Sequence, residues 1–214
     1  MNRATELTAR ALGVYAGLVA LQHGIGEILQ GDRSPIGMMI HAIGSPCQPE
    51  AVWHACLPAM TVLPTMRLAG AGTIAAALFL VGWSAMHRAR KHRHVILGSL
   101  SLVMLLAGGG FVAPFVGLVA AGGAFLSRGA EEGWRRRVPS FAASGLAALW
   151  PGTLIGLWLW LPGGWLLGHL FPALLLRVSV AVFLLVDLLL PILTVLAALA
   201  RDGYVARRTE VDGT

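Results

Sequence analysis

The chain alternates long apolar segments with short polar ones, and the apolar segments predict its architecture. Runs of about 20 apolar residues are long enough to cross a bilayer as helices. The runs lack the period of two that is typical of membrane β-barrels. We therefore expect an all-α, polytopic helical membrane bundle that forms a single transmembrane domain over residues 1–214. The predicted spans are at about 11–30, 59–86, 95–107, 114–126, 141–161 and 169–200.

Two segments interrupt this pattern. Residues 31–58 contain four prolines and several glycines, so we expect an ordered outer loop there. The apolar run 95–127 holds GGGFVAP at positions 108–114, and three glycines followed by a proline disfavour a continuous helix. The run is therefore either two short spans joined by a tight turn or a re-entrant hairpin. In both cases its two ends return to the same side of the membrane.

The C-terminal third of the chain predicts a turn and a tail. Pro162–Gly164 is expected to form a tight outer turn between spans five and six. The last apolar run is long for one crossing, so it is expected to be tilted or kinked at Pro172 or Pro191. Residues 201–214 are polar and are expected to fray.

Charge sets the predicted orientation. Of the 16 Lys and Arg, only Arg33 falls in a predicted outer loop, and only Arg67 and Arg177 fall inside predicted spans. The others lie at the N-terminus, at 87–94, at 128–140 and in the tail. By the positive-inside rule these segments are cytoplasmic. The chain is therefore expected to cross a bacterial-type inner membrane six times, with both termini in the cytoplasm.

The overall composition agrees with a membrane protein and argues against other classes. The chain is 57% hydrophobic and 12% charged, well below the roughly 25% charge of soluble domains. The net charge of +6 has no separate basic domain to carry it, so we expect no nucleic-acid partner. The first apolar segment lacks a clear small-x-small cleavage site and is interpreted as a retained span rather than a signal peptide.

Ionisable residues inside predicted spans are the candidates for chemistry. His23 and Glu27 are four residues apart, so on a helix they share one face. Arg67, Arg177 and Asp187 also fall within predicted spans, and such groups usually face a bundle interior or a wet cavity. We predict a polar pocket near the outer face, with Glu27 paired to Arg67 or Arg177 and with Asp187 deeper. The alternative is a structural salt-bridge cluster that sets helix register.

The case for a metal or cofactor is weak. His23 and Glu27 are acceptable ligands, and His54 or His169 could join them, but no HExxH or repeated Cys/His motif is present. The histidines do not form the paired sets that haem needs, so the cofactor is unknown.

Two cysteines lie in the predicted outer loop. Cys47 and Cys56 could form a disulfide in an oxidising exterior. The chain has no C-x-x-C motif, which argues against a thiol-redox enzyme.

Three functions remain open at this point. The first is the handling of a small solute or ion in the polar pocket. The second is a membrane-embedded enzyme on a lipid-like substrate, in which His23 and Glu27 transfer protons. The third is a non-catalytic subunit of a larger membrane complex. The absence of a clear internal repeat weighs against a transporter, and a homo-oligomer is compatible with all three.

Overall fold

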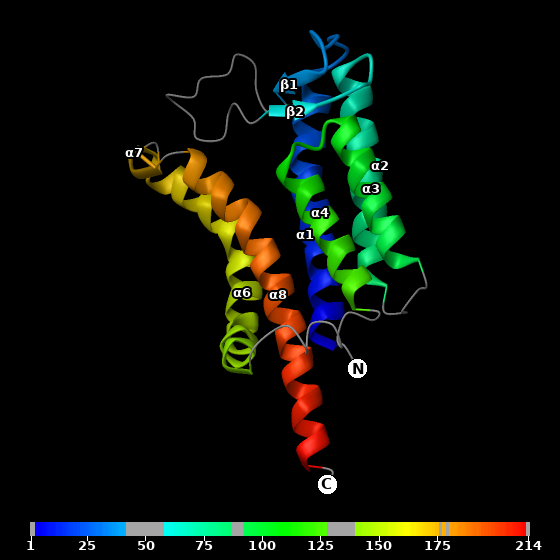
Figure 1. The fold of residues 1–214 in the computed structure, drawn as a ribbon. Coiled ribbons are helices and arrows are strands. Elements are labelled where there is room, and N and C mark those ends of the chain that lie inside the picture. Colours follow the sequence, from blue (N-terminus) through cyan, green and yellow to red (C-terminus); the bar gives the residue numbers. More distant parts are fainter. Residues whose placement is uncertain are drawn as a thin grey trace.

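The computed structural model describes residues 3–41, 58–86, 92–127, 140–175, 177–178 and 180–212. Within these ranges the fold is almost entirely helical, as the sequence predicts, and it also contains one short antiparallel pair of strands (Figure 1). The helices are α1 (Arg3–Leu29), α2 (Met66–Ala85), α3 (Arg93–Ala107), α4 (Val112–Leu126), α6 (Ser140–Leu170), α7 (Pro172–Leu175) and α8 (Val180–Asp212). The strands are β1 (Met39–His41) and β2 (Pro58–Met60).

Helix α1 forms the centre of the bundle. Its residues Leu12, Ala16 and Ala20 are completely buried in the main hydrophobic core. It packs closely on α2 through small residues, because a Cβ added at Gly17 would lie 2.8 Å from the Ala77 carbonyl oxygen. Gly13 and Gly17 are four residues apart on α1, and such a face of small residues suits close helix packing. The absence of a side chain at Gly17 therefore lets the backbones of α1 and α2 approach closely.

Helices α3 and α4 form the broken hairpin that the GGGFVAP segment predicts. Helix α3 ends when the amides of Gly108 and Gly109 both donate to the Met104 carbonyl, at 3.2 and 2.8 Å. Gly108 and Gly110 then adopt φ of 127° and 73°, which L-residues with a side chain rarely adopt. The two helices of 15 residues each are about 22 Å long, shorter than a typical bilayer core.

The start of α2 differs from the prediction of a span from residue 59. Residues 58–60 belong to β2 and pair with β1, and Thr65 caps the helix by accepting from the Leu68 amide. Helix α2 therefore begins at Met66, seven residues later than expected. Pro64 lies just before the cap and cannot supply a backbone donor, which favours a helix start here over a longer span.

The C-terminal region also corrects the sequence reading. The prediction of a tight turn at Pro162–Gly164 is wrong, because α6 continues through Pro151 and Pro162 to Leu170. The chain breaks instead near Phe171, and the last long helix begins at Val180 rather than near residue 169. The tail expected to fray is helical as far as Asp212. Apolar surroundings favour helical backbone pairing, so prolines do not end every membrane helix.

Four helices of the described chain are long and apolar enough to cross a membrane. These are α1, α2, the Ala143–Gly168 part of α6 and the Val182–Thr209 part of α8. Figure 1 shows α6 and α8 as a pair beside the bundle of α1, α2, α3 and α4. The pair contacts this bundle mainly through α8, which packs on α1 and α4. The start of α1 and the end of α8 lie at the same end of the molecule.

Candidate functional site

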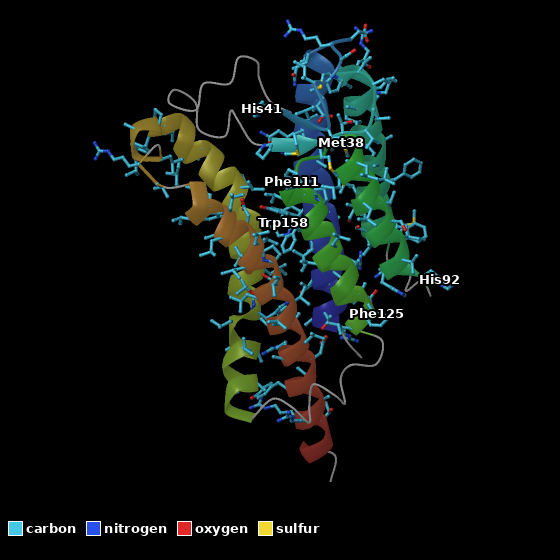
Figure 2. All side chains as sticks on the ribbon, turned by 45° about the horizontal axis from the view of Figure 1, so that its top comes forward. Met38, His41, His92, Phe111, Phe125 and Trp158 are labelled. Carbon is cyan, nitrogen blue, oxygen red and sulfur yellow. The ribbon has the colours of Figure 1, made fainter. Side chains whose placement is uncertain are left out.

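The His23 and Glu27 side chains lie inside the bundle, as the sequence predicts for one face of α1. Glu27 is completely buried and His23 is 6% exposed. Both are near the end of α1 that faces the β-hairpin, and Glu27 lies two residues before the helix ends. Figure 2 shows Met38, His41 and Phe111 at this end, while His92 and Phe125 lie at the opposite end. We call this pair and its surroundings the His23–Glu27 site.

The turn between α3 and α4 covers the His23–Glu27 site. A Cβ added at Gly108 would lie 2.6 Å from the Glu27 carboxyl carbon, and one added at Gly110 would lie 2.7 Å from His23 Cε1. Both positions therefore need glycine for two reasons. Each has a positive φ, and a side chain at either position would collide with Glu27 or His23. The unusual GGG sequence is explained by backbone packing directly on two ionisable side chains.

The hydrogen bonding inside the site is incomplete. Thr73 Oγ1 of α2 donates a long hydrogen bond of 3.4 Å to Glu27 Oε2. Within the described part of the chain, Glu27 Oε1 and His23 Nδ1 are buried and have no hydrogen-bond partner. Buried polar atoms are nearly always paired, because leaving one unpaired costs about 1–3 kcal/mol. The Glu27 carboxylate can therefore accept a further hydrogen bond, or it can bind a proton or a cation.

The two arginines expected near Glu27 lie elsewhere. Arg67 is the second residue of α2, and its guanidinium pairs with Asp32 at 2.9 Å, where both side chains are about 60% exposed. The predicted Glu27–Arg67 ion pair is therefore wrong. Arg177 is exposed in the turn that follows α7, and Figure 1 shows α7 away from the α1–α4 bundle. The site consequently has an acid without an arginine counterion among the described residues.

Asp187 is buried as expected, but it lies at a different height along the bundle from the His23–Glu27 site. Its Oδ1 accepts from Trp160 Nε1 at 2.8 Å, which joins α8 to α6. The nearby Trp158 contacts the Tyr15 ring of α1 at 5.7 Å between centroids. Tyr15 is twelve residues before Glu27, about 18 Å along the helix. Asp187 is thus associated with the middle of α1 and not with the His23–Glu27 site.

No group of three or more potential metal ligands occurs among the residues that the structure describes. His54, Cys47 and Cys56, which the sequence suggests for metal binding or a disulfide, lie outside those residues. His169 is within α6, but the position of its side chain is also outside the described part. The weak metal hypothesis therefore receives no further support from the His23–Glu27 pair.

Sequence reasoning missed a second polar cluster at the opposite end of α1. Asp202 of α8 accepts from the amides of Ala4 and Thr5, at 2.9 and 2.8 Å, and from Thr5 Oγ1 at 2.7 Å. Arg93 of α3 pairs with Glu6 at 2.9 Å. We call these groups, together with Arg10, the charged end. Asp202 lies in the tail that was expected to fray, and no local pattern indicates that it caps a helix almost 200 residues away.

The chain has no match among protein-family models, curated proteins or solved structures.

Proposed function

We propose that this is an integral membrane protein that binds a small cation, the proton included, at the His23–Glu27 site in the outer half of the bilayer. In this proposal the chain crosses a bacterial-type inner membrane six times, with α3 and α4 as two short crossings and both ends in the cytoplasm. The positions of the start of α1 and the end of α8 at one end of the molecule support an even number of crossings. The distribution of Lys and Arg supports the cytoplasmic side for that end.

The observation that carries the proposal is the burial of Glu27 with an unpaired carboxylate oxygen. A carboxylate in an apolar interior is costly unless it is paired or neutralised. Thr73 supplies one long hydrogen bond, which is weak compensation for a full charge. A bound proton or cation would balance Glu27, and His23 Nδ1 on the same helix face is a second buried polar atom without a hydrogen-bond partner among the described residues.

The charge of the site favours a cation over an anion. A pocket shared by Glu27 and two arginines would be net positive, but Arg67 is paired with Asp32 and Arg177 lies in an exposed turn. Among the described residues, the ionisable groups that remain at the site are one acid, Glu27, and one histidine, His23. The backbone of the Gly108–Gly110 turn adds polar groups without adding charge, as in transporters that bind ions at broken helices.

The proposal can be tested by measuring charge displacement on solid-supported membranes. Proteoliposomes would be exposed to concentration jumps of Na⁺, K⁺, NH₄⁺ and H⁺ in turn. We expect one of these cations to produce a transient current above that of protein-free vesicles. Glu27→Gln should abolish the current, because it removes the charge and keeps the shape of the side chain. Thr73→Val should weaken the response, because it removes the side-chain hydroxyl that donates to Glu27 Oε2.

Asp32→Asn is the matched control, since it removes an acid from an exposed ion pair on the same half of the bundle. Its current should equal that of the wild type. If none of the four cations gives a current, or if Glu27→Gln responds like the wild type, the proposal is wrong and Glu27 has a structural role.

A further inference from the structure

The pair of strands β1 and β2 has one face on the bundle and one face open. It lies at the end of the molecule where Figure 2 labels Met38 and His41. Ile40 and Ala59 are directly opposite each other and are buried, and they pack with Met66 in a small core of their own. Side chains alternate between the two faces of a strand, so the residues on either side of Ile40 and Ala59 belong to the open face.

This open face carries two thioethers and one imidazole. Met39 is 55% exposed, His41 is exposed and Met60 is partly exposed. Met39 and Met60 are direct partners across the two strands, and such partners have Cβ atoms about 4.5–5.5 Å apart. His41 follows Met39 by two residues, which is about 7 Å along the same face. We call these three side chains the Met–His face.

The backbone that carries the Met–His face is tied to the helices. The Gln30 side chain, directly after α1, donates to the His41 carbonyl at 3.1 Å. The Val62 amide, shortly after β2, donates to the Leu106 carbonyl of α3 at 3.0 Å. The strands are therefore held in place, and only side chains have to turn for their ligand atoms to converge. Methionine does this easily, because it is unbranched and has three rotatable bonds.

The kinds of ligand atom point to a class of metal ion. Thioether sulfur is a soft ligand that favours Cu(I), and imidazole binds copper as well. Magnesium and calcium take oxygen ligands, and zinc sites use thiolate, imidazole and carboxylate. The described His, Cys, Asp and Glu residues form no group of three, so the sulfur atoms are essential to a site here. Two thioethers and a neutral imidazole carry no negative charge, which suits a monovalent ion.

Exposure alone does not distinguish these methionines from their neighbours. Ile36 and Val62 at the same end of the molecule are exposed as well, and their side chains are pure hydrocarbon. The Met–His face differs in its register, which places two sulfur atoms and an imidazole on one side of a fixed pair of strands.

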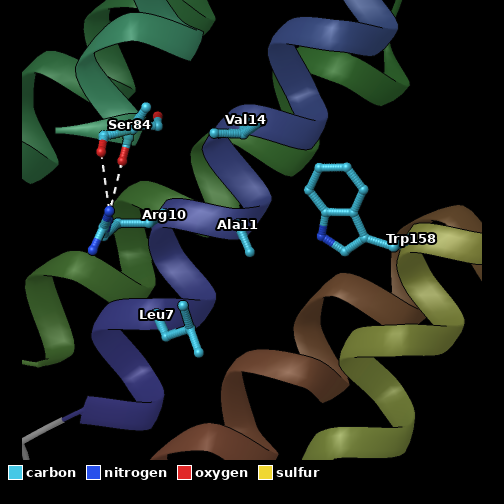
Figure 3. A pocket seen from close by; sticks show the side chains of 7 residues that line it. Leu7, Arg10, Ala11, Val14, Ser84 and Trp158 are labelled. Atoms are coloured by element: carbon cyan, nitrogen blue, oxygen red, sulfur yellow. Dashed lines mark hydrogen bonds between the residues drawn. The ribbon is translucent and has the colours of Figure 1, made fainter. Parts of the chain in front are cut away.

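The groove near the charged end lacks such ligands. Figure 3 shows Arg10 there, donating to the carbonyls of Ser84 and Ala85 at 3.2 and 3.0 Å. The lining of the groove is otherwise mostly apolar and contains no thioether, thiol, imidazole or carboxylate. Metal-ligand chemistry is therefore a property of the strand pair and not of this groove.

We propose that the Met–His face binds one Cu(I) ion through the sulfur atoms of Met39 and Met60 and a ring nitrogen of His41. In the orientation proposed above, the bound ion lies at the outer surface of the membrane. This site uses no residue of the His23–Glu27 site, so it stands or falls independently of cation binding at Glu27.

Anaerobic titration with Cu(I) against the chromophoric chelator bicinchoninate measures the affinity of the protein in detergent. Thiolates are strong ligands for Cu(I) too, so every protein in the series carries Cys47→Ser and Cys56→Ser. We expect one Cu(I) for each chain. Met39→Leu, Met60→Leu and His41→Gln should each weaken binding about tenfold or more, because even the loss of a group that only supports a ligand costs about 10–100-fold in affinity.

Met38→Leu is the matched control. Met38 is 54% exposed, nearly as much as Met39, but it directly precedes β1, and adjacent residues of an extended chain point to opposite faces. Its affinity for Cu(I) should equal that of the cysteine-free parent. Leucine conserves the volume of methionine, so all three Met→Leu proteins should keep the fold, which thermal melting checks.

NMR of isotope-labelled methionine methyl groups shows which thioethers bind. Addition of Ag(I), a soft monovalent ion that does not change its oxidation state in the experiment, should shift the two signals that are missing in Met39→Leu and Met60→Leu. The signal missing in Met38→Leu should not move. The proposal is overturned by an absence of Cu(I) binding, by unchanged binding in Met39→Leu and Met60→Leu, or by an equal loss in Met38→Leu. The methionines would then be apolar residues of the outer surface.

Discussion

The two ends of α1 place ionisable groups in opposite situations. At the charged end, Asp202 accepts three hydrogen bonds and Arg93 pairs with Glu6. At the His23–Glu27 site, the Glu27 carboxylate has one long hydrogen bond and a glycine turn packed against it. The charged end joins α1 to α3 and α8 through satisfied polar groups. The other end buries an acid whose hydrogen bonding is incomplete, which is typical of a functional site rather than of a structural one.

The largest effect should come from the turn that covers the His23–Glu27 site. Gly108→Val would introduce a β-branched residue at φ 127° and force atoms against the Glu27 carboxylate. We expect a loss of about 3 kcal/mol or more in unfolding free energy. Thermal and denaturant unfolding in detergent would measure it.

Gly122→Ala is the control for this prediction, since a Cβ there would meet nothing within 4 Å and the residue lies inside α4. It should be neutral or slightly stabilising. A Gly108→Val protein as stable as Gly122→Ala would mean that the turn does not pack on Glu27.

The next largest effect should be at the charged end. Asp202→Ala removes the acceptor of the Ala4 and Thr5 amides at the start of α1. The loss of a helix cap costs about 0.5–2 kcal/mol, and Asp202 accepts from a buried hydroxyl as well, so we expect about 2 kcal/mol. Reversible unfolding followed by circular dichroism would measure it. If Asp202→Ala unfolds like the wild type, α8 does not cap α1.

Glu27→Gln and Asp202→Asn should change the unfolding free energy in opposite directions. The amide removes a buried charge that has only one long hydrogen bond, so the stability should stay equal or rise by up to about 1 kcal/mol. Asp202→Asn should lower the stability, because an amide accepts with only one of its two terminal atoms. Equal losses in the two variants would show that both acids are structural.

The smallest effect is expected for the exposed pair of Arg67 and Asp32. Surface ion pairs contribute about 0–1 kcal/mol, and both side chains here are about 60% exposed. Arg67→Gln should therefore change the unfolding free energy by less than about 0.5 kcal/mol. A double-mutant cycle with Asp32→Asn would measure the coupling, and a value above 1 kcal/mol would place this pair in a less exposed environment.

Some features of the site could be predicted from the sequence because they depend on local spacing. His23 and Glu27 share a helix face by their spacing of four residues, and the GGGFVAP segment indicates a break in the apolar run. Both expectations are confirmed by the structure. The contact between that break and the acid could not be predicted, since it joins residues about 80 positions apart.

The errors have a common physical origin. Placing Arg67 inside a span assumed that α2 begins at residue 59, whereas β2 and the Thr65 cap delay it until Met66. Ending a helix at Pro162 assumed that a proline stops a membrane helix as it usually stops a soluble one. In each case the predicted helix boundary differs by several residues from the boundary in the structure.

The sequence by itself determined an all-helical fold with helices long and apolar enough to cross a membrane, because long apolar runs with few charges favour helices whose surfaces avoid water. It also determined which ionisable residues are placed in apolar segments. Only the tertiary structure decided which of them meet. Arg67 binds Asp32, Asp187 binds Trp160, Asp202 caps α1, and Glu27 remains with Thr73 and a glycine turn. The physical reason is that the partner of a buried charge is set by the register and rotation of packed helices, and small residues such as Gly17 and Gly108 control how closely these segments approach.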